Sequence, residues 1–217
     1  MTIDVIRQIG ATAREVSSRE ENGATARVLV ATRSYRTSPE DLWDAITSAE
    51  RIPRWFLPIT GELRLGGRYQ LEGNAGGEIL ECDPPRRLGL TWSMHGQVSW
   101  VNVQLTKEAK GGTFLRLEHI AHVPDDMWDR FGPGAVGVGW DGVLLGLDQH
   151  LTKGAAIRAE NALAWQTSEE GKSFFRQSSD AWGSASIAAG TDPSSARAAA
   201  ERTTAFYTGE ATDPVQT

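Results

Sequence analysis

Apolar side chains recur at every second position through the middle of the chain, in short segments separated by turn residues. Leu88, Leu90 and Trp92 show this alternation most clearly. A period of two with polar neighbours indicates strands of a sheet that has one buried face. The strands that the pattern predicts cover residues 62–65, 68–73, 77–83, 87–94, 98–107 and 113–122. Glycine and proline clusters separate them, so we expect an antiparallel meander.

A β-hairpin and two short helices are predicted ahead of this meander. The expected segments are a hairpin made of residues 9–17 and 24–35, a helix that begins at residue 38, and a short helical piece at 48–51. Asn22-Gly23 supports the hairpin because both residue types tolerate the positive φ of tight turns. Ser38 followed by Pro39 is typical of a helix start, with serine as the cap and proline at the first helical position.

A long helix is predicted at residues 140–151, where the apolar positions return with the period of an α-helix. Trp140, Leu144 and Leu147 fall on one continuous stripe of such a helix. The stretch before it, residues 131–139, is rich in glycine and lacks the lysine and serine of a phosphate-binding loop. We expect this stretch to be either a flexible lid or a plain connection.

The tail after the long helix predicts two more helices joined by a tight turn. The segment 167–170 fits a capping box, and Asp192-Pro193 opens the second helix. Acidic side chains balance the basic ones in these helices, so a packing hairpin is favoured over a DNA-binding helix-turn-helix. The final residues, 210–217, are expected to fray.

Composition and charge narrow the classes of function. The chain has 217 residues, a formal net charge of -6 and a pI of about 5.3. This acidity argues against nucleic-acid binding and against docking on an anionic membrane surface. Cys82 is the single cysteine, which excludes an intrachain disulfide and favours a reducing compartment. The sequence has no continuous apolar segment long enough for a signal peptide or a membrane span, so we expect a cytoplasmic protein.

Several strings of the sequence, in this order, resemble one known superfamily. They are SPEDLWDAIT (38–47), PRWF (53–56), GELRLGGRY (61–69), GEILECDPPRRL (77–88), TFLRLEH (113–119) and GWD (139–141). Together they are similar to the START-like superfamily called SRPBCC, and within it to the group homologous to the C-terminal domain of the activator of heat-shock protein ninety's ATPase. The resemblance spans roughly residues 27–151.

The resemblance implies an α+β fold of the helix-grip type (START-like, Bet v 1-like). In this fold a curved antiparallel sheet surrounds a long C-terminal helix, and here a helical hairpin would be appended to it. We expect the helix-grip domain at residues 1–152, including the hairpin 9–35, and the helical extension at 153–217.

Members of the superfamily bind apolar ligands, cyclise or aromatise polyketides, or act as co-chaperones. The resemblance therefore favours binding of a small hydrophobic or aromatic molecule in a cavity between the sheet and the long helix. A polyketide cyclase or dehydratase, and a co-chaperone that stimulates a chaperone ATPase, are the alternatives. We expect no cofactor and no metal, and a homodimer or a chaperone partner is left open.

Eight tryptophans and one histidine supply the candidate site residues. Aromatic walls with a few polar groups suit a flat apolar ligand, although ordinary core packing is the favoured explanation for any single tryptophan. His119 shares the parity of Leu115 and Leu117, and Glu78 or Glu72 would be its partner in acid–base chemistry if either also points inward. A histidine at the end of its strand that hydrogen-bonds to the backbone is the favoured alternative. The residues expected to line the site are Trp55, Tyr69, Leu71, Glu78, Leu80, Trp92, Val101, His119, Trp140 and Leu144.

Overall fold

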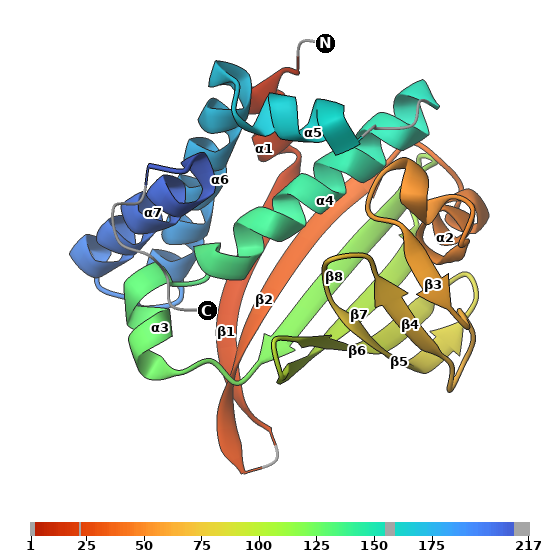
Figure 1. The fold of residues 1–217 in the computed structure, drawn as a ribbon, viewed down its shortest axis with the longest axis horizontal. Helices are drawn as coiled ribbons and strands as arrows, with labels where there is room; N and C mark the ends of the chain where they lie inside the picture. The colour runs from red at the N-terminus through yellow and green to blue at the C-terminus, as the bar shows by residue number, and fades with distance from the viewer. Residues whose placement is uncertain (1–2, 22, 155–158, 211–217) are drawn as a thin grey trace. The chain divides into compact units, whose positions relative to one another are not determined.

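The computed structural model describes residues 3–21, 23–154 and 159–210 of the chain (Figure 1). Within them the strands form one sheet in the order β1-β2-β8-β7-β6-β5-β4-β3, and neighbours from β3 to β8 pair antiparallel. The strands are β1 (Thr12–Glu21), β2 (Ala24–Tyr35), β3 (Ile59–Gly61), β4 (Arg68–Leu71), β5 (Gly76–Asp83), β6 (Arg87–Met94), β7 (Gln97–Lys107) and β8 (Thr113–Ala121). The predicted α+β helix-grip class is confirmed.

The helices lie before, within and after the strands along the chain. They are α1 (Val5–Gly10), α2 (Pro39–Thr47), the 3-10 helix η1 (Ile52–Arg54), α3 (Asp125–Phe131), α4 (Gly134–Lys153), α5 (Ala159–Gln166), α6 (Glu169–Ala188) and α7 (Pro193–Thr208). Backbone contacts group all these elements into two compact units that interleave along the sequence. The first unit is Met1–Ala31, His122–Gly142 and Arg158–Thr217, and the second is Thr32–Ala121 and Val143–Ile157. The expected domain boundary near residue 152 stays a prediction.

The sheet of the second unit has two faces that differ in polarity. Leu90 lies opposite Val101, and Val101 lies opposite His119, so these side chains point to the same side. Gln104 and Thr106 alternate with them and are exposed on the other side. We call the first side the inner face. Its residues include Tyr69, Leu71, Ile79, Cys82, Leu88, Leu90, Trp92, Ser99, Val101, Val103, Leu105, Leu115, Leu117 and His119.

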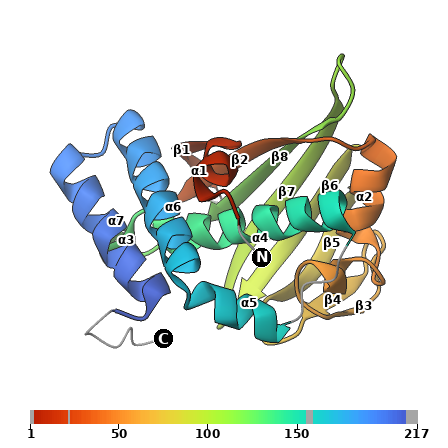
Figure 2. The ribbon, with the colours of Figure 1, turned by 90° about the horizontal axis from the view of Figure 1, so that it is seen from above.

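The second half of α4, residues 143–153, lies over this sheet (Figures 1 and 2). Two contacts with β2 hold it there. The hydroxyl of Tyr35 donates a hydrogen bond of 3.1 Å to the carbonyl oxygen of Leu144, and Arg33 forms an ion pair of 3.1 Å with Asp148. Leu144 and Leu147 are almost completely buried. The part of the predicted amphipathic stripe that contains Leu144 and Leu147 therefore packs into the core of the second unit.

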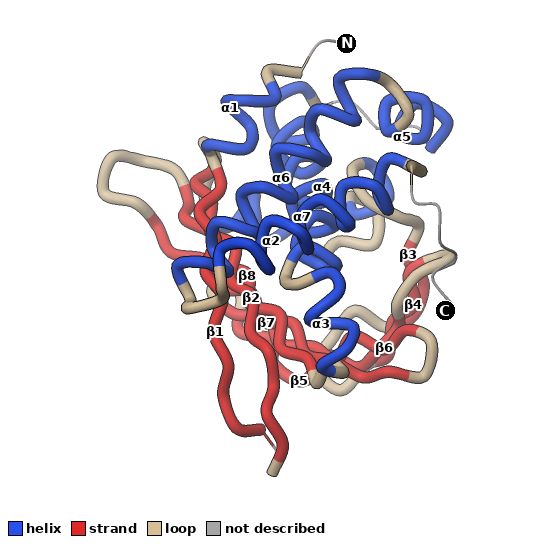
Figure 3. The backbone as a smooth tube through the Cα atoms, turned by 90° about the vertical axis from the view of Figure 1, so that its left-hand side faces the viewer, coloured by secondary structure: helices blue, strands red, loops and turns tan. Residues whose placement is uncertain are grey.

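In the first unit, α6 and α7 form the helical hairpin that the capping residues predict. Ser168 caps α6 by accepting a hydrogen bond from Gly171 N, and Asp192 caps α7 by accepting from Ser194 N and Ser195 N. The two helices lie side by side in every view (Figure 3). The capping box predicted at 167–170 implies Thr167 as the cap, so α6 begins one residue later than expected, whereas Asp192 caps α7 as predicted. Of the end predicted to fray, 210–217, residues 211–217 fall outside the described residues.

Asp141 connects three elements of the first unit through a buried polar cluster. Its carboxylate accepts a hydrogen bond of 2.9 Å from Nε of Arg14 on β1 and one of 3.1 Å from Nε1 of Trp182 on α6. The hydroxyl of Ser178 on α6 donates to the same carboxylate. Because Asp141 is only 3% exposed, these donors replace the water that a carboxylate normally binds.

Most of the glycine-rich stretch, residues 131–139, is helical. The expectation that it forms a flexible lid or a plain connection was therefore wrong. The helix predicted from residue 140 begins at Gly134, and the missed helix α3 precedes it. The reason is packing against the C-terminal hairpin. A Cβ added to Gly137 would lie 2.5 Å from Cδ2 of Trp182, and one added to Gly134 would lie 3.0 Å from Cγ2 of Thr203. Glycine is therefore the residue that lets this half of α4 approach α6 and α7.

Gly137→Ala is expected to destabilise the protein although alanine has the higher helix propensity. The methyl group would force the Trp182 ring to move, which costs about 1–3 kcal/mol. Gly142→Ala, in the same helix, is the matched control because nothing lies within 4 Å of its added Cβ, and it should gain about 0.5–1 kcal/mol. Urea unfolding of both variants measures the difference, and equal effects would contradict the packing argument.

Three smaller expectations were also wrong. The hairpin's first strand begins at Thr12, because Asp4 caps the helix α1 by accepting from the backbone N–H of Arg7. The strand expected at 62–65 is a turn closed by a hydrogen bond of 2.8 Å from Gly67 N to Arg64 O, and β3 precedes it at Ile59–Gly61. The helical piece expected at 48–51 is the 3-10 helix Ile52–Arg54.

Candidate functional site

The inner face of the second unit brings together half of the residues expected to line a ligand site. Tyr69 and Leu71 on β4, Trp92 on β6, Val101 on β7 and His119 on β8 all point to this side of the sheet. Leu144 belongs to the second half of α4, and Trp55 directly follows η1. These elements are far apart in the sequence, and the antiparallel register aligns their side chains.

Two predicted site residues, Glu78 and Leu80, point to the other side of the sheet. Glu78 lies opposite Arg68, which is exposed, and the side chain of Leu80 is 50% exposed. A bulge between Ile79 and Glu81 breaks the alternation there, so that Ile79 and Cys82 share the inner face. Glu78 is therefore not the partner of His119, and Glu72 is exposed beyond the end of β4.

Trp140 lies in a different compact unit from the other nine predicted site residues. It is buried on the first half of α4 and belongs to the first unit. All the others belong to the second unit. The candidate site therefore consists of residues of the second unit.

His119 on β8 hydrogen-bonds to a hydroxyl group of the neighbouring strand β7. Its Nε2 lies 2.8 Å from Oγ of Ser99, and that hydroxyl donates a hydrogen bond of 3.0 Å to the carbonyl oxygen of Trp92. Because the hydroxyl has one proton and gives it to the carbonyl, Nε2 of His119 must be the donor to Ser99. The serine is thus oriented by the sheet, and its proton is not directed at the imidazole.

The polar groups of the inner face carry no charge near neutral pH. Burial lowers the pKa of His119 to about 4. Burial likewise raises the pKa of Tyr69, whose hydroxyl donates a hydrogen bond of 2.8 Å to the carbonyl oxygen of Thr91. Since both groups are neutral and hydrogen-bonded, this face offers polar anchor points inside an otherwise apolar surface.

Apolar side chains in the middle of the inner face remain partly accessible to solvent. Leu90 and Trp92 on β6 and Val103 on β7 are only half-buried, although their strands are central in the sheet. The neighbouring Val101 and Leu105 are buried. An accessible apolar surface of this kind gains free energy when another apolar group covers it, at about 25 cal/mol per Å².

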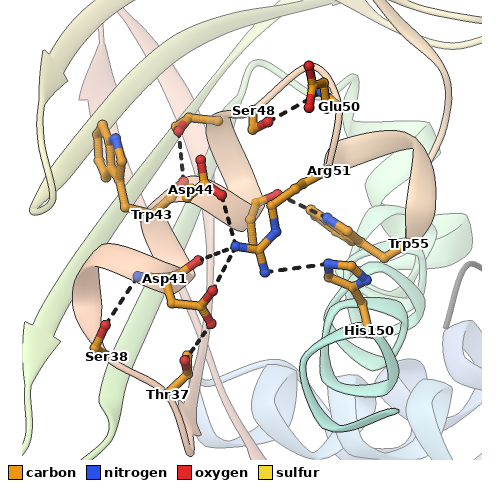
Figure 4. A network of polar contacts seen from close by, with 12 residues as sticks. Thr37, Ser38, Asp41, Trp43, Asp44, Ser48, Glu50, Arg51, Trp55 and His150 are labelled. Carbon is orange, nitrogen blue, oxygen red and sulfur yellow. Dashed lines mark hydrogen bonds and ion pairs between the residues drawn. The ribbon is translucent and has the colours of Figure 1, made fainter. Parts of the chain in front are cut away.

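A polar network at one end of α4 was not foreseen from the sequence (Figure 4). Nη1 of Arg51 donates to Asp41 at 2.7 Å and to Asp44 at 2.9 Å, both on α2. Nη2 of the same guanidinium lies 3.5 Å from Nε2 of His150 on α4. Nearby, Nε1 of Trp55 donates a hydrogen bond of 3.0 Å to the carbonyl oxygen of Ala45. No motif marks this network, because its members come together only through packing of α2, η1 and α4.

Two further features of the described part of the chain concern membrane-spanning helices and groups of metal ligands. None of the helices described is long and apolar enough to cross a membrane. Within residues 3–21, 23–154 and 159–210, no three histidine, cysteine, aspartate or glutamate side chains are grouped so that they could hold a metal ion.

Comparison with known proteins agrees with this architecture. Residues 36–152 match the family model described as Activator of Hsp90 ATPase homolog 1-like protein. The crystal structure of CalU16 from Micromonospora echinospora is 33% identical, with a TM-score of 0.61, and the match covers 81% of this chain and 98% of that one. The solution structure of CalU16 is 32% identical, with a TM-score of 0.66, covering 82% and 97%. None of the curated proteins matches the chain.

A more distant structure shares the fold alone. DynU16, from the dynemicin biosynthetic locus, is 18% identical with a TM-score of 0.52, and the match covers 64% of this chain and 60% of that one. Identity at this level supports the arrangement of helices and strands but carries no information about a shared ligand.

Proposed function

From the premise that the chain belongs to the Activator of Hsp90 ATPase homolog 1-like family, we propose that it binds a small hydrophobic or aromatic molecule. The ligand would lie between the inner face of the sheet and the second half of α4. The observation that carries this proposal is the partly accessible apolar surface of Leu90, Trp92 and Val103 on the central strands. Covering that surface is the main favourable contribution that this site can offer a ligand.

The polar groups of the site favour a binding function over proton-transfer catalysis. An acid–base mechanism needs two titratable groups that face each other with pKa values near the working pH. His119 has a hydroxyl partner, Ser99, and burial holds the pKa of the histidine at about 4. A neutral imidazole that donates to a fixed serine is better suited to orient a ligand than to exchange protons with it. The cyclase or dehydratase alternative therefore has less support.

A fluorescent probe tests the proposal directly. Nile red is neutral and aromatic, and its emission should rise with saturation when it is added to the protein. Leu90→Asn should weaken its binding about tenfold, because an amide replaces an apolar contact on the inner face. Leu80→Asn is the matched control and should leave the dissociation constant unchanged, since Leu80 points to the other side of the sheet.

Two results would contradict the proposal. One is emission that does not saturate, and the other is an equal dissociation constant in both variants, with circular dichroism showing that each is folded. Native mass spectrometry of the freshly purified protein adds independent evidence. A small apolar molecule that co-purifies with the wild type, and is reduced in Leu90→Asn, is the expected result.

A further inference from the structure

His150 lies on the face of α4 that packs into the second unit. It follows Leu147 by three positions, and residues at this spacing share one side of a helix. Leu147 is 1% exposed and His150 is 5% exposed. The imidazole is therefore enclosed by protein, at the same side of α4 that covers the sheet. Figure 4 shows it beside Arg51.

The contact with Arg51 determines which ring nitrogen of His150 carries the proton. A guanidinium can only donate, so Nε2, which lies 3.5 Å from Nη2 of Arg51, must accept. A neutral ring then has its proton on Nδ1. Burial, together with the positive charges of Arg51 and Arg54, lowers the pKa of His150 and so favours this neutral form, while the charge of Asp41 acts weakly in the opposite direction.

The Nδ1–H of His150 is a buried donor without an acceptor. Among the described residues, no hydrogen-bond partner lies within reach of this atom. A buried N–H group without a partner costs about 1–3 kcal/mol, so proteins rarely keep one unless another molecule pairs with it. The neighbouring groups of the network are all paired with one another. Within this network, Nδ1 of His150 is the buried side-chain atom for which the described residues supply no partner.

We infer that Nδ1–H of His150 donates a hydrogen bond to an oxygen acceptor, a carbonyl or an ether, on the bound aromatic molecule. This inference rests on the proposed function and narrows its ligand class. The apolar inner face would hold the rings, and His150 would orient them through one acceptor atom. A pure hydrocarbon would fill the same site but would leave the donor unpaired.

Fluorene and fluorenone form a matched pair of probes for this inference. They have the same ring system and differ by one carbonyl oxygen, so the ratio of their dissociation constants isolates the hydrogen bond from general packing. Equilibrium dialysis measures both constants. The preference for fluorenone should fall about tenfold in His150→Phe relative to the wild type, because phenylalanine keeps the ring and removes the donor.

Two further variants separate the hydrogen bond from a structural effect. His150→Gln can accept from Arg51 and still donate through its amide, so it should retain most of the preference. His95→Asn removes an exposed histidine in the turn after β6, where asparagine tolerates the positive φ of 51°, and should leave the ratio unchanged. If His150→Phe does not fold, the wild type provides the test. In a long-range hydrogen–nitrogen NMR spectrum, Nδ1 of His150 should be protonated, and its proton should shift with fluorenone but not with fluorene.

The outcomes distinguish this inference from the proposed function. If both probes bind and their ratio is the same in the wild type and His150→Phe, the ligand site stands and the role of His150 is overturned. The role of His150 is also overturned if the ring is protonated on Nε2, or if the chemical shift of the Nδ1 proton does not change with fluorenone. If neither probe binds the wild type, both this inference and the proposed binding of aromatic molecules are contradicted.

Discussion

Replacing Asp141 with alanine is expected to lower the free energy of unfolding by about 3–5 kcal/mol. The substitution removes the carboxylate that accepts from Arg14, Ser178 and Trp182 and leaves the guanidinium buried without its counter-charge. The ion pair is enclosed, because the side chains of Arg14 and Asp141 are 6% and 2% exposed. Water cannot enter easily to replace the lost partner, so the full cost of an unpaired buried charge should appear. Urea unfolding followed by circular dichroism measures it.

The pair itself is not expected to be a large net source of stability. Burial raises the pKa of Asp141, and the charge of Arg14 with the hydrogen bonds from Ser178 and Trp182 only partly opposes this effect. A double variant, Arg14→Met with Asp141→Leu, should therefore be more stable than Asp141→Ala alone. Asp180→Ala, at an exposed position of α6, is the control and should change stability by less than about 0.5 kcal/mol. Equal losses in Asp141→Ala and Asp180→Ala would show that the cluster does not stabilise the first unit.

Lowering the pH should destabilise the protein through His119. The folded pKa is about 4, against an ordinary value of 6.5, because the buried ring resists protonation. The unfolded chain therefore takes up a proton before the folded one does, and the stability contributed by the neutral ring is complete above pH 6.5. It is lost as the pH falls from 6.5 to about 4, and the loss amounts to about 3 kcal/mol.

The variant His119→Gln separates this effect from the titration of carboxylates in the same range. Glutamine can donate to Ser99 and does not titrate, so the variant should be less sensitive to pH between 6.5 and 4 than the wild type. The measurement is the urea midpoint at several pH values for the two proteins. Parallel curves would mean that His119 is not the buried neutral histidine described above.

The strands of the second unit were predictable because their pattern is local. Two-residue alternation placed β6 at its observed bounds and β7 and β8 to within one residue at each end, since one side of each strand is buried and the other is polar. Helix caps likewise depend on residues that are close together in the sequence. Ser38 and Asp192 each hydrogen-bond to backbone N–H groups within the next three residues, so their roles could be inferred from short strings, and the cap of α6 was missed by one residue.

The first half of α4 was not predictable because its helix depends on residues much later in the chain. Glycines at 134 and 137 lower helix propensity, and local rules therefore favour a loop. The structure overrides those rules because Trp182 and Thr203 pack where side chains on these glycines would be. Only knowledge of the tertiary contact could have changed the prediction.

The candidate site was predictable only where the strands are regular. Alternation correctly grouped Val101 and His119, but it placed Glu78 and Leu80 on the wrong side. A bulge of one residue shifts the parity in β5, and no turn residue in the sequence marks it. His150 was missed for a different reason. Its Nδ1 has no hydrogen-bond partner among the residues that the structure describes, which is a property of three-dimensional packing and has no sequence signal.

The glycine-rich half of α4 has a consequence for the order in which the chain folds during synthesis. It leaves the ribosome before α6 and α7 exist, and these helices carry the indole ring and the methyl group against which it packs. Until then, its glycines favour an open chain. The nascent protein is therefore expected to complete this part only after α7 has emerged, so translation that stalls within α6 would leave the segment exposed to proteases.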